Sequence, residues 1–133
     1  MYAALKDGYR LVDTANAYVN EKAVGRGMKK SGVKREDIFL STKLWPTVYE
    51  DDSAVEKTLQ RLGTDYIDLL FIHQPAGNYI AGYKQLEKAY KAGIVKSIGH
   101  FKLPRGKASE AVGRCGDQAP CYPVGGASVL YAE

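Results

Sequence analysis

Short apolar runs alternate with amphipathic segments along the chain. Four of these runs, at residues 9–12, 38–41, 66–72 and 94–98, predict β-strands. The third run is almost continuously apolar apart from Asp68, which is typical of a parallel strand that is buried on both faces. Strands separated by helical segments indicate βαβ units and a parallel sheet.

The helices between these strands are predicted from their ends and their apolar faces. We expect helices over residues 20–31, 53–62 and 81–92, and a shorter one over residues 1–6. Asn20 can cap the first, Ser53 and Glu56 have capping-box spacing in the second, and a glycine follows each of the three. The apolar faces of the second and third helices are formed by Val55, Leu59 and Leu62, and by Tyr83, Leu86 and Tyr90.

The strand ends indicate a repeating unit. Asp13, Lys43, His73 and Gly99 lie roughly 30 residues apart, the length of a unit with one strand and one helix. A complete (β/α)8 barrel needs about 250 residues, whereas the chain has 133. We therefore expect an α/β fold, a partial (β/α)8 TIM barrel of about four parallel strands with alternating helices, over residues 1–103. Residues 104–133 are expected to be a divergent tail containing Gly, Cys and Pro, with at most a short strand near residues 128–131.

Composition narrows the functional classes. The apolar share of 45% and the charged share of 26% are those of an ordinary soluble globular protein. The net charge of +4 is scattered along the chain and forms no basic stripe, so a nucleic-acid partner is not expected. No segment resembles a signal peptide or approaches the roughly 18 apolar residues of a membrane span. We expect a cytoplasmic protein without a membrane partner.

Three ionisable residues end successive predicted strands: Asp13, Lys43 and His73. A lone strand-end Asp or Lys is usually a cap or a surface residue. Barrels of this type, however, place their chemistry at the carboxyl ends of the strands, so three such residues at equivalent positions would meet at one rim. No spacing of Cys and His suggests a metal site, and none is expected.

The motifs around these residues resemble those of the aldo-keto reductase family. Residues 9–15 read Tyr-Arg-Leu-Val-Asp-Thr-Ala and are followed by Tyr18, while residues 41–45 read Ser-Thr-Lys-Leu-Trp. Residues 62–69 and 72–75 are similar to the family's histidine strand. The resemblance covers about residues 1–101 and implies a catalytic tetrad of Asp13, Tyr18, Lys43 and His73.

The resemblance implies reduction of small aldehydes or ketones to alcohols by hydride from a nicotinamide cofactor, usually NADPH. Tyr18 would donate the proton that the carbonyl oxygen needs as negative charge develops on it. Lys43 would stabilise the phenolate, Asp13 would keep Lys43 charged and in place, and both would adjoin the cofactor. His73 would orient the substrate oxygen or assist proton transfer.

Two neighbouring residues have alternative interpretations. Trp45 could form an apolar wall for the substrate, or it could be a buried structural residue. Glu21 is interpreted as a first-turn charge that complements the helix dipole.

The fourth predicted strand departs from the family pattern. The family's strand ends in Gly followed by a Ser-Asn pair, which holds the nicotinamide carboxamide, and then Phe. Here His100 and Phe101 follow Gly99 directly. His100 is either a replacement ligand or a solvent-facing loop residue, the commoner situation. The later strands and the family's basic loop for the 2′-phosphate are not found either.

These differences predict weak NADPH binding by this chain and two open strand edges that favour self-association. A non-catalytic binding or assembly module is the alternative from another class. A further alternative is an inactive product of truncation, or of a frame shift after about Lys102.

Overall fold

The computed structural model describes residues 1–101, 121–124 and 127–130. Helices and strands alternate through the first part in the following order: α1 (Tyr2–Lys6), β1 (Leu11–Asp13), α2 (Glu21–Ser31), β2 (Phe39–Leu44), α3 (Ala54–Leu62), β3 (Leu69–Ile72), α4 (Tyr79–Lys91) and β4 (Ile98–Phe101). Two further strands follow, β5 (Cys121–Val124) and β6 (Ala127–Leu130). Short 3₁₀ turns lie at Asn16–Tyr18, Arg35–Asp37 and Pro46–Val48.

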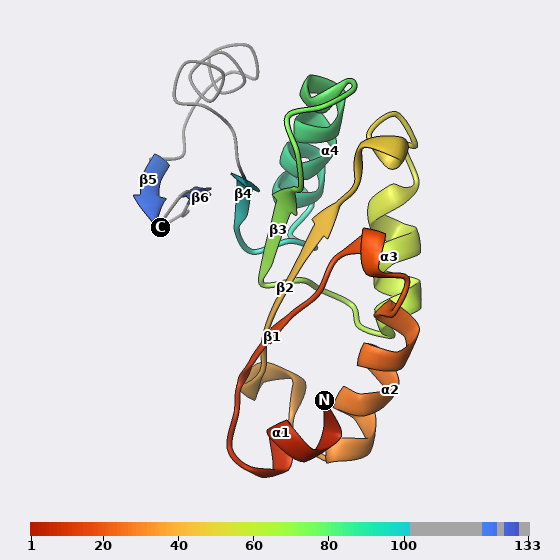
Figure 1. Ribbon diagram of the computed structural model, residues 1–133, viewed down its shortest axis with the longest axis vertical. Coiled ribbons are helices and arrows are strands. Elements are labelled where there is room, and N and C mark those ends of the chain that lie inside the picture. Colours follow the sequence, from red (N-terminus) through yellow and green to blue (C-terminus); the bar gives the residue numbers. More distant parts are fainter. Residues whose placement is uncertain (102–120, 125–126, 131–133) are drawn as a thin grey trace.

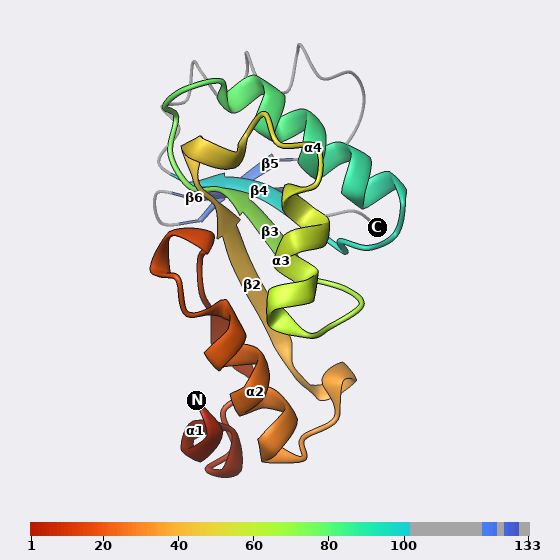
Figure 2. The same ribbon diagram turned by 90° about the vertical axis from the view of Figure 1, so that its right-hand side faces the viewer.

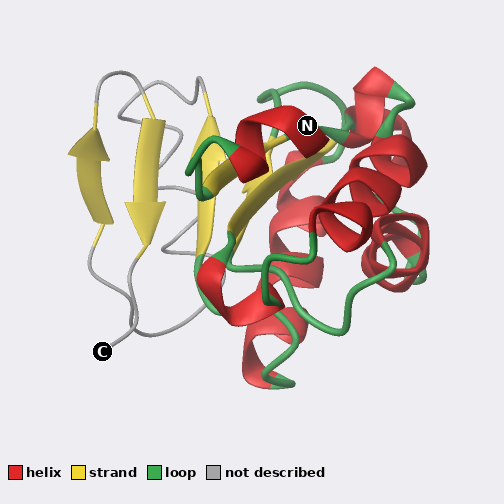
Figure 3. Cartoon of the chain, turned by 90° about the horizontal axis from the view of Figure 1, so that it is seen from below, coloured by secondary structure: helices red, strands yellow, loops and turns green. Residues whose placement is uncertain are grey.

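One sheet contains all of these strands, in the order β1-β2-β3-β4-β6-β5. Strands β1 to β4 run parallel, with Val12 beside Leu40, Leu70 beside Ile98 and adjacent strands directly paired. Helices α2, α3 and α4 lie against one face of this sheet (Figures 1 and 2). The view from below in Figure 3 shows the helices and the sheet as two layers. The predicted arrangement of four parallel strands alternating with helices is confirmed.

The edge of β4 is paired, contrary to the expectation of two open edges in a four-stranded sheet. Strand β6 runs antiparallel to β4, with Ile98 opposite Leu130, and β5 pairs with the far side of β6. The unpaired backbone N–H and C=O groups of β4 are satisfied by β6 in this way. The short strand predicted near residues 128–131 corresponds to β6, whereas β5 was not predicted.

Strands β1, β2 and β4 extend beyond the carboxyl ends of the apolar runs that predicted them, and β3 begins later than its run. Pairing with neighbours carries β2 through the polar residues Thr42 and Lys43, although the apolar run stops before them. Ile38, Ile67 and Val95, near the starts of three of the runs, are buried although they lie before the strands begin. Burial of these side chains therefore marks the core and not the strand boundaries.

The core lies between the sheet and the helices. Its two larger clusters join the helix-facing side chains of the strands to one face of each helix: Leu44, Leu70, Ile72, Ile98, Val55, Tyr83 and Leu86 in one, and Val12, Leu40, Val24, Met28 and Leu62 in the other. The predicted apolar faces of α3 and α4 are confirmed. Burial of such side chains provides the main stabilisation of this layer.

Helix ends follow the sequence signals only in part. The glycines after the three longer helices take left-handed conformations, with φ of 71° at Gly32 and 64° at Gly63. The capping box at Ser53 was wrong, because the Ser53 hydroxyl donates to Asp51 Oδ1 at 2.6 Å and caps no helix N–H. Helix α4 begins two residues earlier than predicted, since Asn78 Oδ1 accepts from the Ala81 N–H at 3.2 Å.

Candidate functional site

Strand register brings polar side chains onto the sheet face opposite the helices. Asp13 pairs with Ser41, and Lys43 pairs with Phe71. Because side chains alternate between the two faces of a strand, these four residues share one face, and His73, two residues beyond Phe71, continues it. Asp13 ends β1, Lys43 lies near the end of β2 and His73 follows β3. The predicted meeting of these three strand ends is thus found at one rim.

Lys43 is a buried cation held by two oxygens. Its side chain is 8% exposed, and its Nζ lies 2.6 Å from Asp13 Oδ2. It also donates to the Thr14 carbonyl at 3.0 Å. The Asp13 side chain is 48% exposed, so the carboxylate forms the open side of the ion pair. A buried ammonium requires such partners, because its loss of hydration is costly when uncompensated.

Tyr18 reaches the same rim from the loop between β1 and α2. It ends the 3₁₀ turn and is half-exposed. The Lys43 ammonium lies 5.7 Å from the centre of its ring, within the range of a cation–π contact. The edge-to-face contact with His73 has a centroid distance of 6.0 Å and an interplanar angle of 87°. Val19, directly after Tyr18, has a left-handed backbone with φ of 54°.

His73 lies between Tyr18 and Trp45. It is 9% exposed, and its backbone N–H donates to the Leu44 carbonyl at 3.1 Å. The Trp45 ring meets the His73 ring edge-on, with centroids 4.9 Å apart and an angle of 80°. All five residues singled out from the sequence for this site, Asp13, Tyr18, Lys43, Trp45 and His73, are therefore connected by direct contacts.

Two residues that support the ion pair were not predicted as part of the site. The Ser41 hydroxyl donates a hydrogen bond to Asp13 Oδ1. Thr14 accepts from Lys43 through its carbonyl, donates from its backbone N–H to the Ser41 carbonyl at 3.0 Å, and donates from its hydroxyl to Asn20 Oδ1 at 2.7 Å. Ser41 and Thr14 lie in the same sequence motifs as Lys43 and Asp13, and this closeness in sequence is the signal that could have identified them.

Glu21 lies in the first turn of α2, as expected, but it is also 2% exposed. Arg61 of α3 donates from Nε to Glu21 Oε2 at 2.5 Å. The Thr42 hydroxyl approaches Glu21 Oε1 at 3.4 Å, from the residue before Lys43. Besides its place in the first turn, Glu21 therefore takes part in a buried ion pair that its local sequence did not predict.

His100 is neither a loop residue nor a ligand on the face of Lys43. It lies in β4 beside Ile72, whose side chain belongs to the helix-facing core, and it is 1% exposed. Neither of its ring nitrogens has a hydrogen-bond partner within the described part of the chain. Burial lowers the pKa of His100 below its ordinary value of 6.5. The strand alternation that places Gly99 toward the site turns the next side chain away from it.

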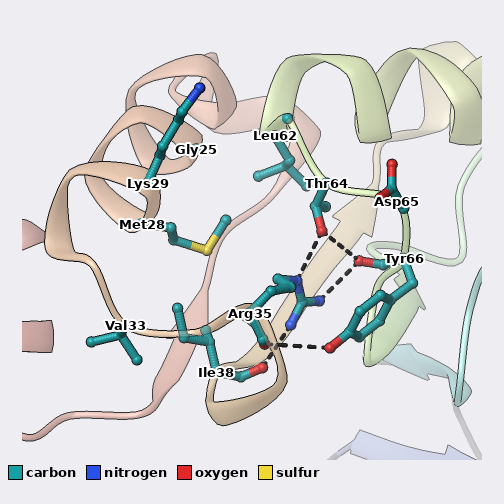
Figure 4. A pocket seen from close by; sticks show the side chains of 11 residues that line it. Gly25, Met28, Lys29, Val33, Arg35, Ile38, Leu62, Thr64, Asp65 and Tyr66 are labelled. Carbon is teal, nitrogen blue, oxygen red and sulfur yellow. Dashed lines mark hydrogen bonds between the residues drawn. The ribbon is translucent and has the colours of Figure 1, made fainter.

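A recess lies at the other end of the sheet, where α2 and α3 end. This cavity has a volume of about 310 Å³ and is lined by Met28, Leu62 and Arg35, among others (Figure 4). Arg35 donates to Thr64 Oγ1 at 2.8 Å and to the Tyr66 carbonyl at 2.9 Å, and stacks on the Tyr66 ring at 3.9 Å. These groups engage the guanidinium, so Arg35 serves as a structural link between the segments.

Residues 1–101, 121–124 and 127–130 offer no cluster of metal ligands and no membrane-spanning helix. No group of three or more His, Cys, Asp and Glu side chains there could hold a metal ion. No helix in that part of the chain has the length and apolar character to cross a membrane.

Comparison with known proteins agrees with this geometry. The sequence profile of the Aldo/keto reductase family matches residues 1–114. The chain is 48% identical over 101 residues to a glyoxal reductase of Bacillus subtilis, covering 73% of this chain and 37% of the relative. It therefore spans little more than a third of that curated relative.

Solved structures are similar in both fold and sequence. An aldo/keto reductase from Brucella melitensis matches 85% of this chain and 46% of its own, with a TM-score of 0.81 and 39% identity. A Bombyx mori aldo-keto reductase in complex with NADP matches 84% of this chain and 42% of its own, with a TM-score of 0.78 and 32% identity. With the profile match spanning most of its length, the chain belongs to the aldo/keto reductase family.

Proposed function

We propose that this chain carries the catalytic residues of a nicotinamide-dependent carbonyl reduction. The observation that supports the proposal most strongly is the set of contacts that joins Asp13, Lys43, Tyr18 and His73 at one rim of the sheet. The substrate would be a small aldehyde or ketone, and the similarity to a protein named glyoxal reductase favours a small aldehyde.

Each residue has a role that follows from its chemistry. NADPH, when bound, would supply the hydride that forms the new C–H bond at the carbonyl carbon. The Tyr18 hydroxyl gives its proton to the carbonyl oxygen, so the C=O bond becomes an alcohol and the tyrosine becomes a phenolate. The nearby Lys43 ammonium stabilises that phenolate, which recovers a proton from solvent because Tyr18 is half-exposed. Asp13 holds the lysine in place.

His73 and Trp45 shape the place of the substrate. His73 lies against the edge of Tyr18 and would orient the carbonyl oxygen toward the hydroxyl. Trp45 packs edge-on against His73 and would form an apolar wall.

The described residues fit only the reacting end of the cofactor. Asp13 and Lys43 offer a carboxylate and a cation on the site's face, next to which the nicotinamide would lie. The carboxamide would have no side-chain ligand from Gly99 or His100, because Gly99 has no side chain and His100 is buried on the helix side. We therefore propose that this chain alone binds NADPH weakly.

NADPH fluorescence and turnover test these points together. The chain alone should show weak binding and little reduction of a generic aldehyde. Joined to the remaining strands of a related reductase, it should bind NADPH and reduce the aldehyde. Tight binding with clear turnover by the chain alone would contradict the weak-binding proposal. A joined protein that folds and binds NADPH but reduces no aldehyde or ketone would contradict the proposed function.

The second candidate is a non-catalytic assembly module. Strand β1 lies at one end of the sheet, and the exposed side chains of Tyr9, Leu11 and Phe39 gather near it. Such an edge favours pairing with a second copy of this chain.

A further inference from the structure

The Tyr18 loop is held at both ends by groups outside the tetrad. At its start, Thr14 is bonded to β2 through its backbone N–H and carbonyl, to Ser41 and Lys43. Next to its far end, Glu21 opens α2 three residues after Tyr18. The contacts of the Tyr18 ring with Lys43 and His73 are ring contacts at 5.7 and 6.0 Å. The position of the Tyr18 ring therefore depends on the loop backbone that carries it.

Glu21 is an unusual anchor because its carboxylate is almost fully buried. At 2% exposure its charge requires a partner, which is Arg61 at 2.5 Å. Arg61 is in turn oriented by Thr58, whose hydroxyl accepts from Nη2 at 2.9 Å. The Arg61 side chain is 30% exposed, so the pair lies at the border between core and solvent.

The same carboxylate connects α2 with the strand that carries Lys43. Thr42 is fully buried, and its hydroxyl lies 3.4 Å from Glu21 Oε1. Thr42 and Lys43 are adjacent on β2 and point to opposite faces of the sheet. Glu21 thus ties the loop of the proposed proton donor to the strand of the proposed cation.

Val19 shows that the loop is under constraint. A β-branched residue with positive φ is a backbone outlier, and such conformations persist only where the surrounding structure fixes them. Val19 is 92% exposed, so packing of its side chain does not hold this conformation. The anchors at Thr14 and Glu21 lie on either side of this residue.

We propose that Glu21 and Arg61 are positioning residues, whose ion pair sets the place of Tyr18 relative to Lys43 and His73. The inference rests on the proposed role of Tyr18. The experiment that tests it measures the conformation of the chain without cofactor or substrate. The positioning role can therefore be wrong even if the proposed function is right.

The test compares Glu21→Gln and Arg61→Gln with the matched control Lys57→Gln in the full chain. Lys57 lies on the same helix as Arg61 and forms an exposed ion pair with Asp51. Two-dimensional NMR follows the contact between the Tyr18 and His73 rings. Amide exchange compares the Tyr18 N–H, which is bonded to Ala15 O at 3.0 Å, with the Leu70 N–H of β3.

Loss of one partner of a buried ion pair should accelerate exchange at Tyr18 at least about tenfold more than at Leu70. The ring contact between Tyr18 and His73 should disappear in both variants, and Lys57→Gln should retain it. Arg61→Lys, which keeps a cation, should retain part of the contact between the Tyr18 and His73 rings. If exchange at both amides rises by the same factor and the ring contact persists, the ion pair only stabilises the fold and the proposal is wrong. If Glu21→Gln does not fold, Arg61→Gln, at a partly exposed position, decides by the same criteria.

Discussion

The ion pair between Asp13 and Lys43 predicts an asymmetric response to mutation. Asp13→Ala leaves an ammonium that is 8% exposed, with the Thr14 carbonyl as its remaining hydrogen-bond partner. Breaking a buried pair in this way costs about 3–5 kcal/mol, and the half-exposed position of Asp13 lets water reduce this to about 2 kcal/mol. Lys43→Met removes the buried charge and leaves a carboxylate that solvent reaches. It should change the free energy of unfolding by less than about 1 kcal/mol.

Urea unfolding followed by circular dichroism measures both changes. Ser41→Ala is the control, because it removes the hydroxyl bond to Asp13 and keeps the ion pair. The double variant Asp13→Ala with Lys43→Met should be more stable than Asp13→Ala alone, since no buried charge is left without its carboxylate. A Lys43→Met variant that is destabilised as much as Asp13→Ala would show that an unpaired buried ammonium is not the source of the lost stability.

Three further outcomes are expected. Because burial lowers the pKa of His100, the unfolded chain binds a proton more readily than the folded one, so stability should be highest above about pH 6.5 and fall as the pH drops. Urea midpoints at several pH values should show this fall, and their dependence on pH should be weaker in His100→Leu. If the dependence on pH were unchanged in His100→Leu, His100 would not be the titrating group. Val19→Asn should raise the free energy of unfolding by about 1 kcal/mol, because asparagine tolerates the left-handed backbone; a loss of stability would argue against strain there. Sedimentation should show that the chain self-associates and that Leu11→Lys weakens the association, since Leu11 is 64% exposed in the end strand β1. A monomer at tens of micromolar would contradict self-association.

Local pattern was sufficient for most of the fold because each strand and helix has its own signal. The apolar runs mark buried strands, and the glycines after α2 and α3 mark helix ends with left-handed backbones. The strand ends Asp13, Lys43 and His73 could be brought together in advance, because parallel strands in a barrel end at one rim.

Features that depend on distant partners could not be predicted in this way. Glu21 and Arg61 are 40 residues apart, and the local sequence around neither residue indicates their pairing. The direction of His100 depends on the register of β4 beside β3, which sets which face each side chain takes. The pairing of β6 with β4 likewise joins segments whose local sequences carry weak strand signals.

Tyr18 is the proposed proton donor of a carbonyl reduction. The most direct measurement is aldehyde turnover by the chain joined to the remaining strands of a related reductase, compared between the parent and Tyr18→Phe. The variant keeps the ring and removes the hydroxyl, so turnover should fall by about two to four orders of magnitude while NADPH binding changes little. If Tyr18→Phe retained most of the turnover while His73→Ala abolished it, the account would be contradicted and the histidine would be the acid.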